Sequence, residues 1–140
     1  MPDLWEIAVS SRRDSEIVHK GLRSYNSGFM TRCEDYNFHI EKDGAVAAGI
    51  VAGSVSDTLE IEFLYVDEKY RNKGLGKKLL LHAEEKAAKN GIKRVILNTY
   101  SFQAPGFYEK LGYEKLFEIS PCFSEHSQYY FIKYLGDGGK

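Results

Sequence analysis

The distribution of apolar and polar residues along the chain predicts alternating strands and helices. Strands are expected where apolar residues alternate with polar ones or form short β-branched runs, and helices where apolar residues recur at helical spacing. The expected strands are Leu4–Val9, Asn37–Glu41, Val46–Ser54, Leu59–Val66, Lys93–Thr99, Tyr113–Ile119 and Gln128–Tyr134. The expected helices are Arg13–Leu22, Leu75–Asn90 and Ala104–Leu111, and residues 24–33 are expected to form a loop or a broken helix.

The order of these elements indicates the fold class. Asp43-Gly44 between two apolar runs is a strong hairpin signal, so the strands around it form a meander with Leu59–Val66. A strand–helix–strand unit follows, which adds a parallel pair. We therefore expect an α/β (α+β) fold with a mixed sheet and helices on both faces. One domain is expected over residues 1–135, with a flexible glycine-rich tail at 136–140.

Charge and composition exclude several function classes. A net charge of −1 argues against a dedicated nucleic-acid binder. The sequence has no apolar run that could span a membrane and no signal-peptide pattern at Met1–Ser10, so we expect a cytoplasmic protein without a membrane partner. Cys33 and Cys122 lack the spacing of metal ligands, and we expect neither a disulfide nor a metal site.

The most informative segment is the basic glycine loop Arg71-Asn72-Lys73-Gly74-Leu75-Gly76, which lies between a strand and a helix. A helix N-terminus offers free N–H groups and the positive end of the helix dipole, and glycines let the backbone approach a bulky anion. Lys77 and Lys78 add positive charge, so a pyrophosphate would fit. A glycine turn before a helix can also be only a turn. The Rossmann and P-loop patterns do not match.

At this point the sequence resembles a known family. Val66–Gly76 is similar to the acetyl-CoA signature of the GNAT acetyltransferases, [R/Q]-x-x-G-x-[G/A] after a strand that ends in Val. Leu97-Asn98-Thr99 and Phe107–Tyr113 resemble the second motif of the family, and the two motifs have the right order and spacing. The resemblance covers residues 59–113. It implies the GNAT fold, with a mostly antiparallel sheet of six to seven strands, and acetyl-CoA as co-substrate without a metal.

The resemblance also implies a set of cofactor-binding residues. Backbone N–H groups of the loop and helix start would hold the pyrophosphate. The end of the central strand would pair with the pantetheine arm, where a backbone N–H can polarise the acetyl carbonyl. Asn98, at the end of the next strand, would contact the same arm, and Tyr108 would lie near the thioester. The implied residues are Leu64, Tyr65, Val66, Arg71, Lys73, Gly74, Leu75, Gly76, Lys77, Asn98 and Tyr108.

Three residues are candidates for proton transfer. Tyr108 matches the position of the general acid of the family, although an amphipathic helix can also bury an aromatic residue there. Glu60 and Glu62 lie two apart on the central strand, so a regular strand would turn both to one face. Either could be the general base, with Glu60 at the position where some family members carry one. Both could instead face solvent or pair with a lysine, and a water chain could take the proton.

The predicted function is acetyl transfer from acetyl-CoA to a primary amine, by direct attack in a ternary complex. A small-molecule acceptor is favoured. The alternatives are a protein N-terminus or lysine as acceptor, and a non-catalytic acetyl-CoA-binding module. Acceptor contacts are expected from residues 20–35 and 118–130, which include His126. The aromatic strand Gln128–Tyr134 offers either a homodimer interface or core packing.

Overall fold

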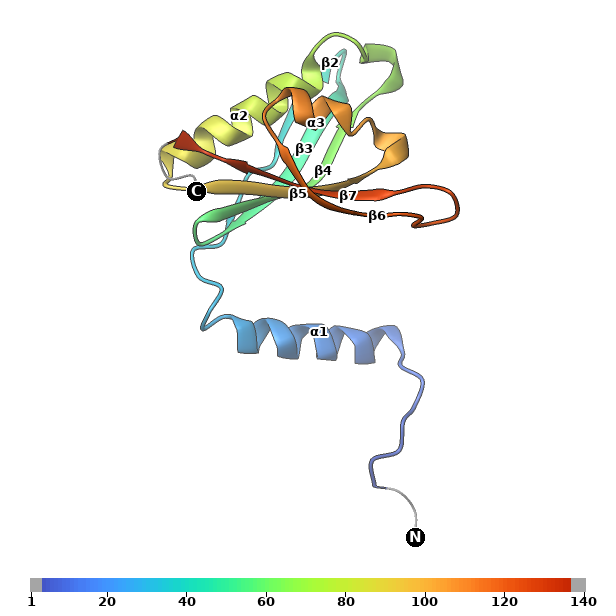
Figure 1. The fold of residues 1–140 in the computed structure, drawn as a ribbon. Helices are drawn as coiled ribbons and strands as arrows, with labels where there is room; N and C mark the ends of the chain where they lie inside the picture. Colours follow the sequence, from blue (N-terminus) through green and yellow to red (C-terminus); the bar gives the residue numbers. More distant parts are fainter. Residues whose placement is uncertain (1–3, 137–140) are drawn as a thin grey trace. The chain divides into compact units, whose positions relative to one another are not determined.

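The computed structural model describes residues 4–136, and this part of the chain divides into two compact units. The first unit ends at Thr31 and the second begins at Arg32 (Figure 1). Of the tail predicted at 136–140, residues 137–140 lie outside the described residues. None of the described helices is long and apolar enough to cross a membrane.

The first unit contains helix α1 (Arg12–Asn26), which begins with a capping box. The Ser11 hydroxyl accepts from the Asp14 backbone N–H at 3.1 Å, and the Asp14 carboxylate accepts from the Ser11 N–H at 2.9 Å. Two free N–H groups at the helix start are thereby satisfied. The helix runs past the predicted end at Leu22, because no residue before Ser27 interrupts its backbone hydrogen bonds.

The prediction of a strand at Leu4–Val9 is wrong. Residues 6–10 have no regular secondary structure, and residues 4 and 5 form a turn. Alternation of side chains alone does not make a strand, because a strand is stabilised by backbone hydrogen bonds to a neighbouring strand. Within the described part of the first unit, α1 is the regular element, and it provides no such neighbour.

The second unit is built on one seven-stranded sheet. Its strands are β1 (Glu34–Asp35), β2 (Phe38–Lys42), β3 (Ala45–Val55), β4 (Thr58–Val66), β5 (Arg94–Tyr100), β6 (Glu114–Ile119) and β7 (Gln128–Tyr134). The order is β1-β3-β4-β5-β7-β6, and β2 also pairs with β3. Only β4 and β5 run parallel among the described pairs. The predicted mixed, mostly antiparallel sheet is confirmed.

The turn between β2 and β3 is also as predicted. Asp43 and Gly44 both have positive φ, at 53° and 78°, which is the conformation of a two-residue hairpin turn that matches the twist of the strands.

Strand β1 was not predicted, because a strand of two residues is too short to give a pattern of apolar and polar positions. The aromatic strand β7 lies inside the sheet between β5 and β6, with Phe131 fully buried.

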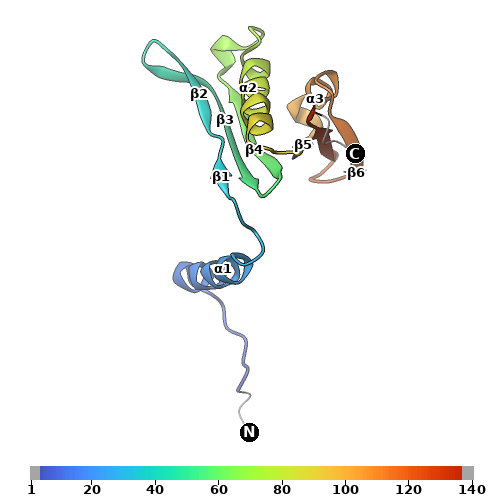
Figure 2. The ribbon, with the colours of Figure 1, turned by 90° about the vertical axis from the view of Figure 1, so that its left-hand side faces the viewer.

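The core forms where α2 (Leu75–Lys89) packs on the sheet, and Figure 2 shows this helix beside β3 and β4. Leu79, Leu80, Ala83 and Ala87 make its buried stripe, as the helical spacing predicted. The short helix α3 (Gly106–Lys110) adds Tyr108 to the same core. Two 3₁₀ turns, η1 (Glu68–Tyr70) and η2 (Ser101–Gln103), follow β4 and β5.

A buried ionic network joins α2 to β7 and to Tyr113, the residue before β6. The Glu84 carboxylate accepts from Lys133 Nζ at 2.7 Å and from the Tyr113 hydroxyl at 2.7 Å. Burial, and then the charge of Glu84, raise the pKa of Tyr113 well above its usual range. Because Glu84 is only 6% exposed, it depends on both partners to compensate for lost hydration.

Removing one partner should therefore destabilise the fold. We expect Lys133→Ala to lower the free energy of unfolding by about 3 kcal/mol, since breaking a buried pair leaves a charge without its counterion. Urea denaturation measures the loss. Lys89→Ala is the control, because Lys89 pairs with Glu85 in solvent, and its effect should be small. Equal effects of the two variants would contradict the role given to the buried network.

Candidate active site

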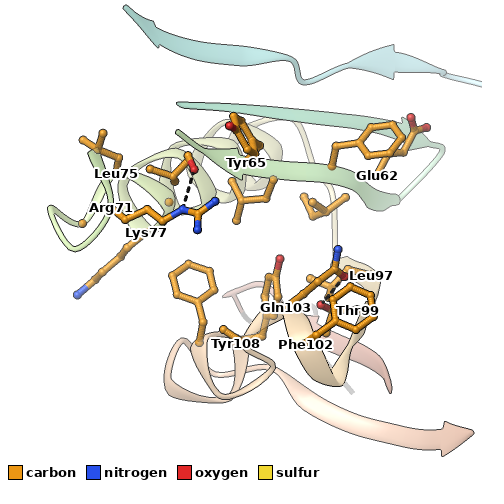
Figure 3. Close-up of a pocket in the computed structure, with 18 of the residues that line it drawn as sticks. Glu62, Tyr65, Arg71, Leu75, Lys77, Leu97, Thr99, Phe102, Gln103 and Tyr108 are labelled. Atoms are coloured by element: carbon orange, nitrogen blue, oxygen red, sulfur yellow. Dashed lines mark hydrogen bonds between the residues drawn. The ribbon is translucent and has the colours of Figure 1, made fainter. Parts of the chain in front are cut away.

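The site is created by the separation of two parallel strands. β4 and β5 are paired only over Thr58–Ile61 and Arg94–Leu97, and beyond these residues they diverge. At the paired end, Arg94 Nη1 donates to Asp57 Oδ1 at 2.7 Å and to Thr58 Oγ1 at 2.9 Å. A cavity of about 780 Å³ opens between the diverging ends (Figure 3). Ligand sites commonly form at such places, because backbone groups there lack strand partners.

A β-bulge at Glu62 interrupts the regular alternation of β4 beside this cavity. Phe63 pairs with Val51 and Ile61 pairs with Ala52, so Glu62 has no residue opposite it on β3. The alternation shifts there, because Leu59 and Ile61 are buried before the bulge, whereas Leu64 and Val66 pack on the core after it. The premise that Glu60 and Glu62 share a face of a regular strand therefore fails. Glu62 lines the cavity, and Glu60 is not among the lining residues.

One end of the cavity is formed by the glycine loop and the start of α2. Asn72 and Gly74 have positive φ, at 65° and 75°, which turns the chain sharply into the helix. No side chain caps this N-terminus and no acidic residue lies in its first turn, so N–H groups of the first turn are available to an anion. The Arg71 Nε donates to the Val66 carbonyl at 3.1 Å, which holds this side chain against the end of β4.

Tyr108 lies on α3, on the wall across from β4. Tyr108 is 9% exposed, and its ring lies 5.8 Å from that of Tyr113 and 6.0 Å from that of Phe131, measured between ring centroids. Burial raises the pKa of Tyr108, so its phenol keeps its proton at neutral pH and above. A neutral phenol that lines a cavity can donate a proton to a group inside it.

The far part of the same wall comes from β5 and η2. The Gln103 side-chain oxygen accepts from the Tyr100 N–H at 3.1 Å and from the Thr99 hydroxyl at 3.2 Å, which fixes the turn after β5. Asn98 also lines the cavity, and its side-chain oxygen accepts from Gln128 Nε2 at 3.1 Å. Figure 3 shows Glu62 and Phe102 at one end of the cavity and Arg71 and Lys77 at the other.

Most of the residues singled out from the sequence meet in this cavity. The lining includes Glu62, Leu64, Tyr65, Val66, Arg71, Gly74, Leu75, Gly76, Lys77, Asn98 and Tyr108. Lys73 and Glu60 are not lining residues.

Sequence reasoning missed a further group of lining residues. These are Ile61, Phe63, Tyr70, Asn72, Leu97, Thr99, Phe102, Gln103, Ala104 and Phe107. Five of them lie inside the two motifs, so the motifs themselves were the available signal: Tyr70, Asn72, Leu97, Thr99 and Phe107. Phe102, Gln103 and Ala104 lie in a turn, where no periodic pattern marks a side chain as facing a cavity.

Comparison with known proteins agrees with this geometry. Residues 1–113 match the model of the acetyltransferase (GNAT) family. An acetyltransferase of Agrobacterium fabrum, Atu2258, is 33% identical over 85% of this chain and 89% of its own. Blasticidin-S acetyltransferase of Streptomyces morookaense is 38% identical over 50% of this chain and 52% of its own.

The fold comparison points the same way. The crystal structure of an acetyltransferase from Bacillus cereus superposes with a TM-score of 0.82, at 30% identity, over 93% of this chain and 97% of its own. Family match, relatives and fold thus agree over most of the chain. The protein belongs to the GNAT family and is an acetyltransferase that takes its acetyl group from acetyl-CoA.

Proposed function

We propose that the protein acetylates the primary amine of a small molecule in the cavity between β4 and β5. The observation that carries the proposal is the chemical contrast along this cavity. Arg71, Lys77 and the start of α2 form a cationic end, and Glu62 forms an acidic end. Anionic and cationic reactants would therefore enter opposite ends of one cavity. The relative named blasticidin-S acetyltransferase, whose name gives a small-molecule acceptor, supports this acceptor class.

The cationic end suits the pyrophosphate of acetyl-CoA. The first-turn N–H groups at Leu75, Gly76 and Lys77 would hold its oxygens, and the glycine at position 74 keeps the approach open, because it has no side chain. The edge of β4 at Leu64–Val66, which has no partner on β5, would pair with the pantetheine arm. Asn98 would contact the same arm from β5.

Two side chains are proposed to move protons. When bound, acetyl-CoA supplies an activated thioester. Tyr108 holds the proton that a thiolate leaving group needs, and its raised pKa keeps this proton in place through the neutral range. Glu62 lines the cavity from β4, on the wall opposite Tyr108, and would accept a proton from the amine. Glu60 is the less favoured base, because it does not line the cavity.

The cofactor site is tested by Gly74→Glu. Acetyl-CoA should raise the melting temperature of the wild type, since a ligand at one hundred times its Kd stabilises the folded state by about 2.7 kcal/mol. Gly74→Glu should abolish this shift, because a carboxylate would lie where the pyrophosphate binds. Gly44→Glu is the matched control: Gly44 also has positive φ, and a Cβ there would also meet open space. It should keep the shift. A preserved shift in Gly74→Glu would refute the site.

The proton donor is tested by Tyr108→Phe. This change keeps the ring and removes the phenol, so kcat should fall by about 10²-fold, while acetyl-CoA binding changes little. In the wild type, the raised pKa means that ionisation of Tyr108 should reduce kcat only above the pH range in which a free tyrosine ionises. Tyr134→Phe, at a tyrosine that does not line the cavity, should keep wild-type turnover. Unchanged kcat in Tyr108→Phe would make Tyr108 a packing residue only.

The base is tested by comparing Glu62→Gln with Glu60→Gln. Both changes preserve shape and remove basicity. We expect Glu62→Gln to lower kcat/KM more, with the largest loss at low pH and partial recovery as the pH approaches the amine pKa of about 10, where free amine is present in solution. The measurement is CoA release over pH with one amine. A larger loss in Glu60→Gln would reverse the assignment, and no loss in either would leave water as the proton acceptor.

A further inference from the structure

Four aromatic side chains gather beyond the acidic end of the cavity. Tyr100 and Phe102 are stacked, with ring centroids 5.3 Å apart and an interplanar angle of 3°. Phe123 meets Tyr100 edge to face at 5.5 Å, and His126 meets Phe102 in the same manner at 5.0 Å. We call these residues, Tyr100, Phe102, Phe123 and His126, the aromatic cluster. It joins the η2 turn to the loop between β6 and β7.

The aromatic cluster is exposed although its members contact one another. Phe102 is 61% exposed and Phe123 is 66% exposed. Exposed apolar side chains that are scattered singly are ordinary, but exposed rings that gather in one cluster favour a surface that contacts something else. Neither ring belongs to the buried core or to the partly buried residues packed against it.

The two segments that carry the aromatic cluster are fixed to each other. The Ser101 N–H donates to the Ser127 carbonyl at 2.9 Å, and the Ser127 N–H donates to the Ser101 hydroxyl at 3.0 Å. The Ser127 hydroxyl donates to that of Ser120 at 2.8 Å, which closes the base of the loop. The two segments that carry the rings are thus joined before any ligand arrives, and this lowers the entropic cost of binding.

Phe102 connects the aromatic cluster to the cavity. It lines the cavity next to Gln103, and Figure 3 shows it at the same end as Glu62, on the opposite wall. A molecule that enters this end meets a carboxylate on one side and an aromatic ring on the other. The carboxylate suits a cationic amine, and the ring suits a flat conjugated group.

We propose that the aromatic cluster selects acceptors in which the amine is attached to a flat conjugated ring, with Phe102 as the residue that stacks on this ring. The proposal rests on the proposed function, because it names the acceptor class of the same site. Phe102 is a specificity-determining residue in this view. Stacking between rings is worth about a two- to tenfold change in affinity beyond apolar burial.

The test uses two amines that differ only in the ring. 2-Phenylethylamine and 2-cyclohexylethylamine have the same amine and linker, and both rings are apolar, but only the first is flat and conjugated. Their Kd values are measured by calorimetry on protein saturated with CoA, which has no acetyl group to transfer. We expect the phenyl compound to bind about two- to tenfold more tightly than the cyclohexyl compound.

Phe102→Leu should remove this preference, because leucine keeps an apolar contact and has no ring. The Kd ratio of the two amines should then approach one. Phe117→Leu is the matched control: Phe117 is also half exposed and stacked, on Tyr130 at 4.5 Å, but it does not line the cavity. It should leave the ratio unchanged. A melting temperature close to that of the wild type verifies that each variant is folded.

The outcomes separate this proposal from the proposed function. A wild-type Kd ratio near one, no binding of either amine, or an unchanged ratio in Phe102→Leu would overturn the ring preference. Release of CoA from acetyl-CoA with either amine would still support small-molecule acetylation in those cases. Conversely, a ring preference that Phe102→Leu removes would support the proposal even if neither amine were acetylated, and the proposed function would then be the part that fails.

Discussion

The shortness of the parallel pairing between β4 and β5 is the constraint on which the site depends. Four residue pairs hold the two strands together, and the Arg94–Asp57 ion pair fixes the end at which they start. After Ile61 and Leu97 the strands separate, although β4 continues to Val66 and β5 to Tyr100. On its other side β4 pairs with β3, and β5 pairs with β7. Both therefore continue as strands beyond the point where they separate from each other. A cavity results that is bounded by rigid backbone on both sides.

The elements around this gap divide the chemistry among them. The loop before α2 brings basic side chains and free N–H groups to one end, the bulge brings Glu62 to the other, and α3 places Tyr108 between two core aromatics. The buried network of Glu84, Lys133 and Tyr113 also supports α3, because the Tyr113 ring contacts the ring of Tyr108 on this helix. Sheet, helix and site are therefore stabilised by shared contacts.

The sequence predicted most of the sheet because its signals are local. The Asp43-Gly44 turn, the strand-forming residues of β4 and the apolar stripe of α2 each favour their own conformation. Leu4–Val9 alternates in the same way, yet forms no strand in the described chain, since a strand depends on a partner that alternation does not reveal. The glycine loop and Tyr108 could be found because they lie in motifs that combine several residue types at fixed spacing.

The remaining parts of the site depend on geometry that spacing does not encode. The bulge at Glu62 is visible only in the register between β3 and β4, so the sequence could not distinguish Glu62 from Glu60. Phe102 reaches the cavity because Gln103 fixes the turn after β5, and the aromatic cluster is completed by a loop some twenty residues later in the chain. Contacts of this kind arise from folding of distant segments, and a single sequence gives no local sign of them.

The extra residue in β4 also separates what the sheet needs from what the site uses. Deleting Glu62 would leave Ile61 opposite Ala52 and Phe63 opposite Val51, and these two pairs would become consecutive. Leu64 and Val66 would then keep their places on the core, because the alternation from Ile61 to Phe63 would be that of a regular strand. The sheet should therefore tolerate loss of this residue, whereas the cavity would lose the carboxylate among its lining residues.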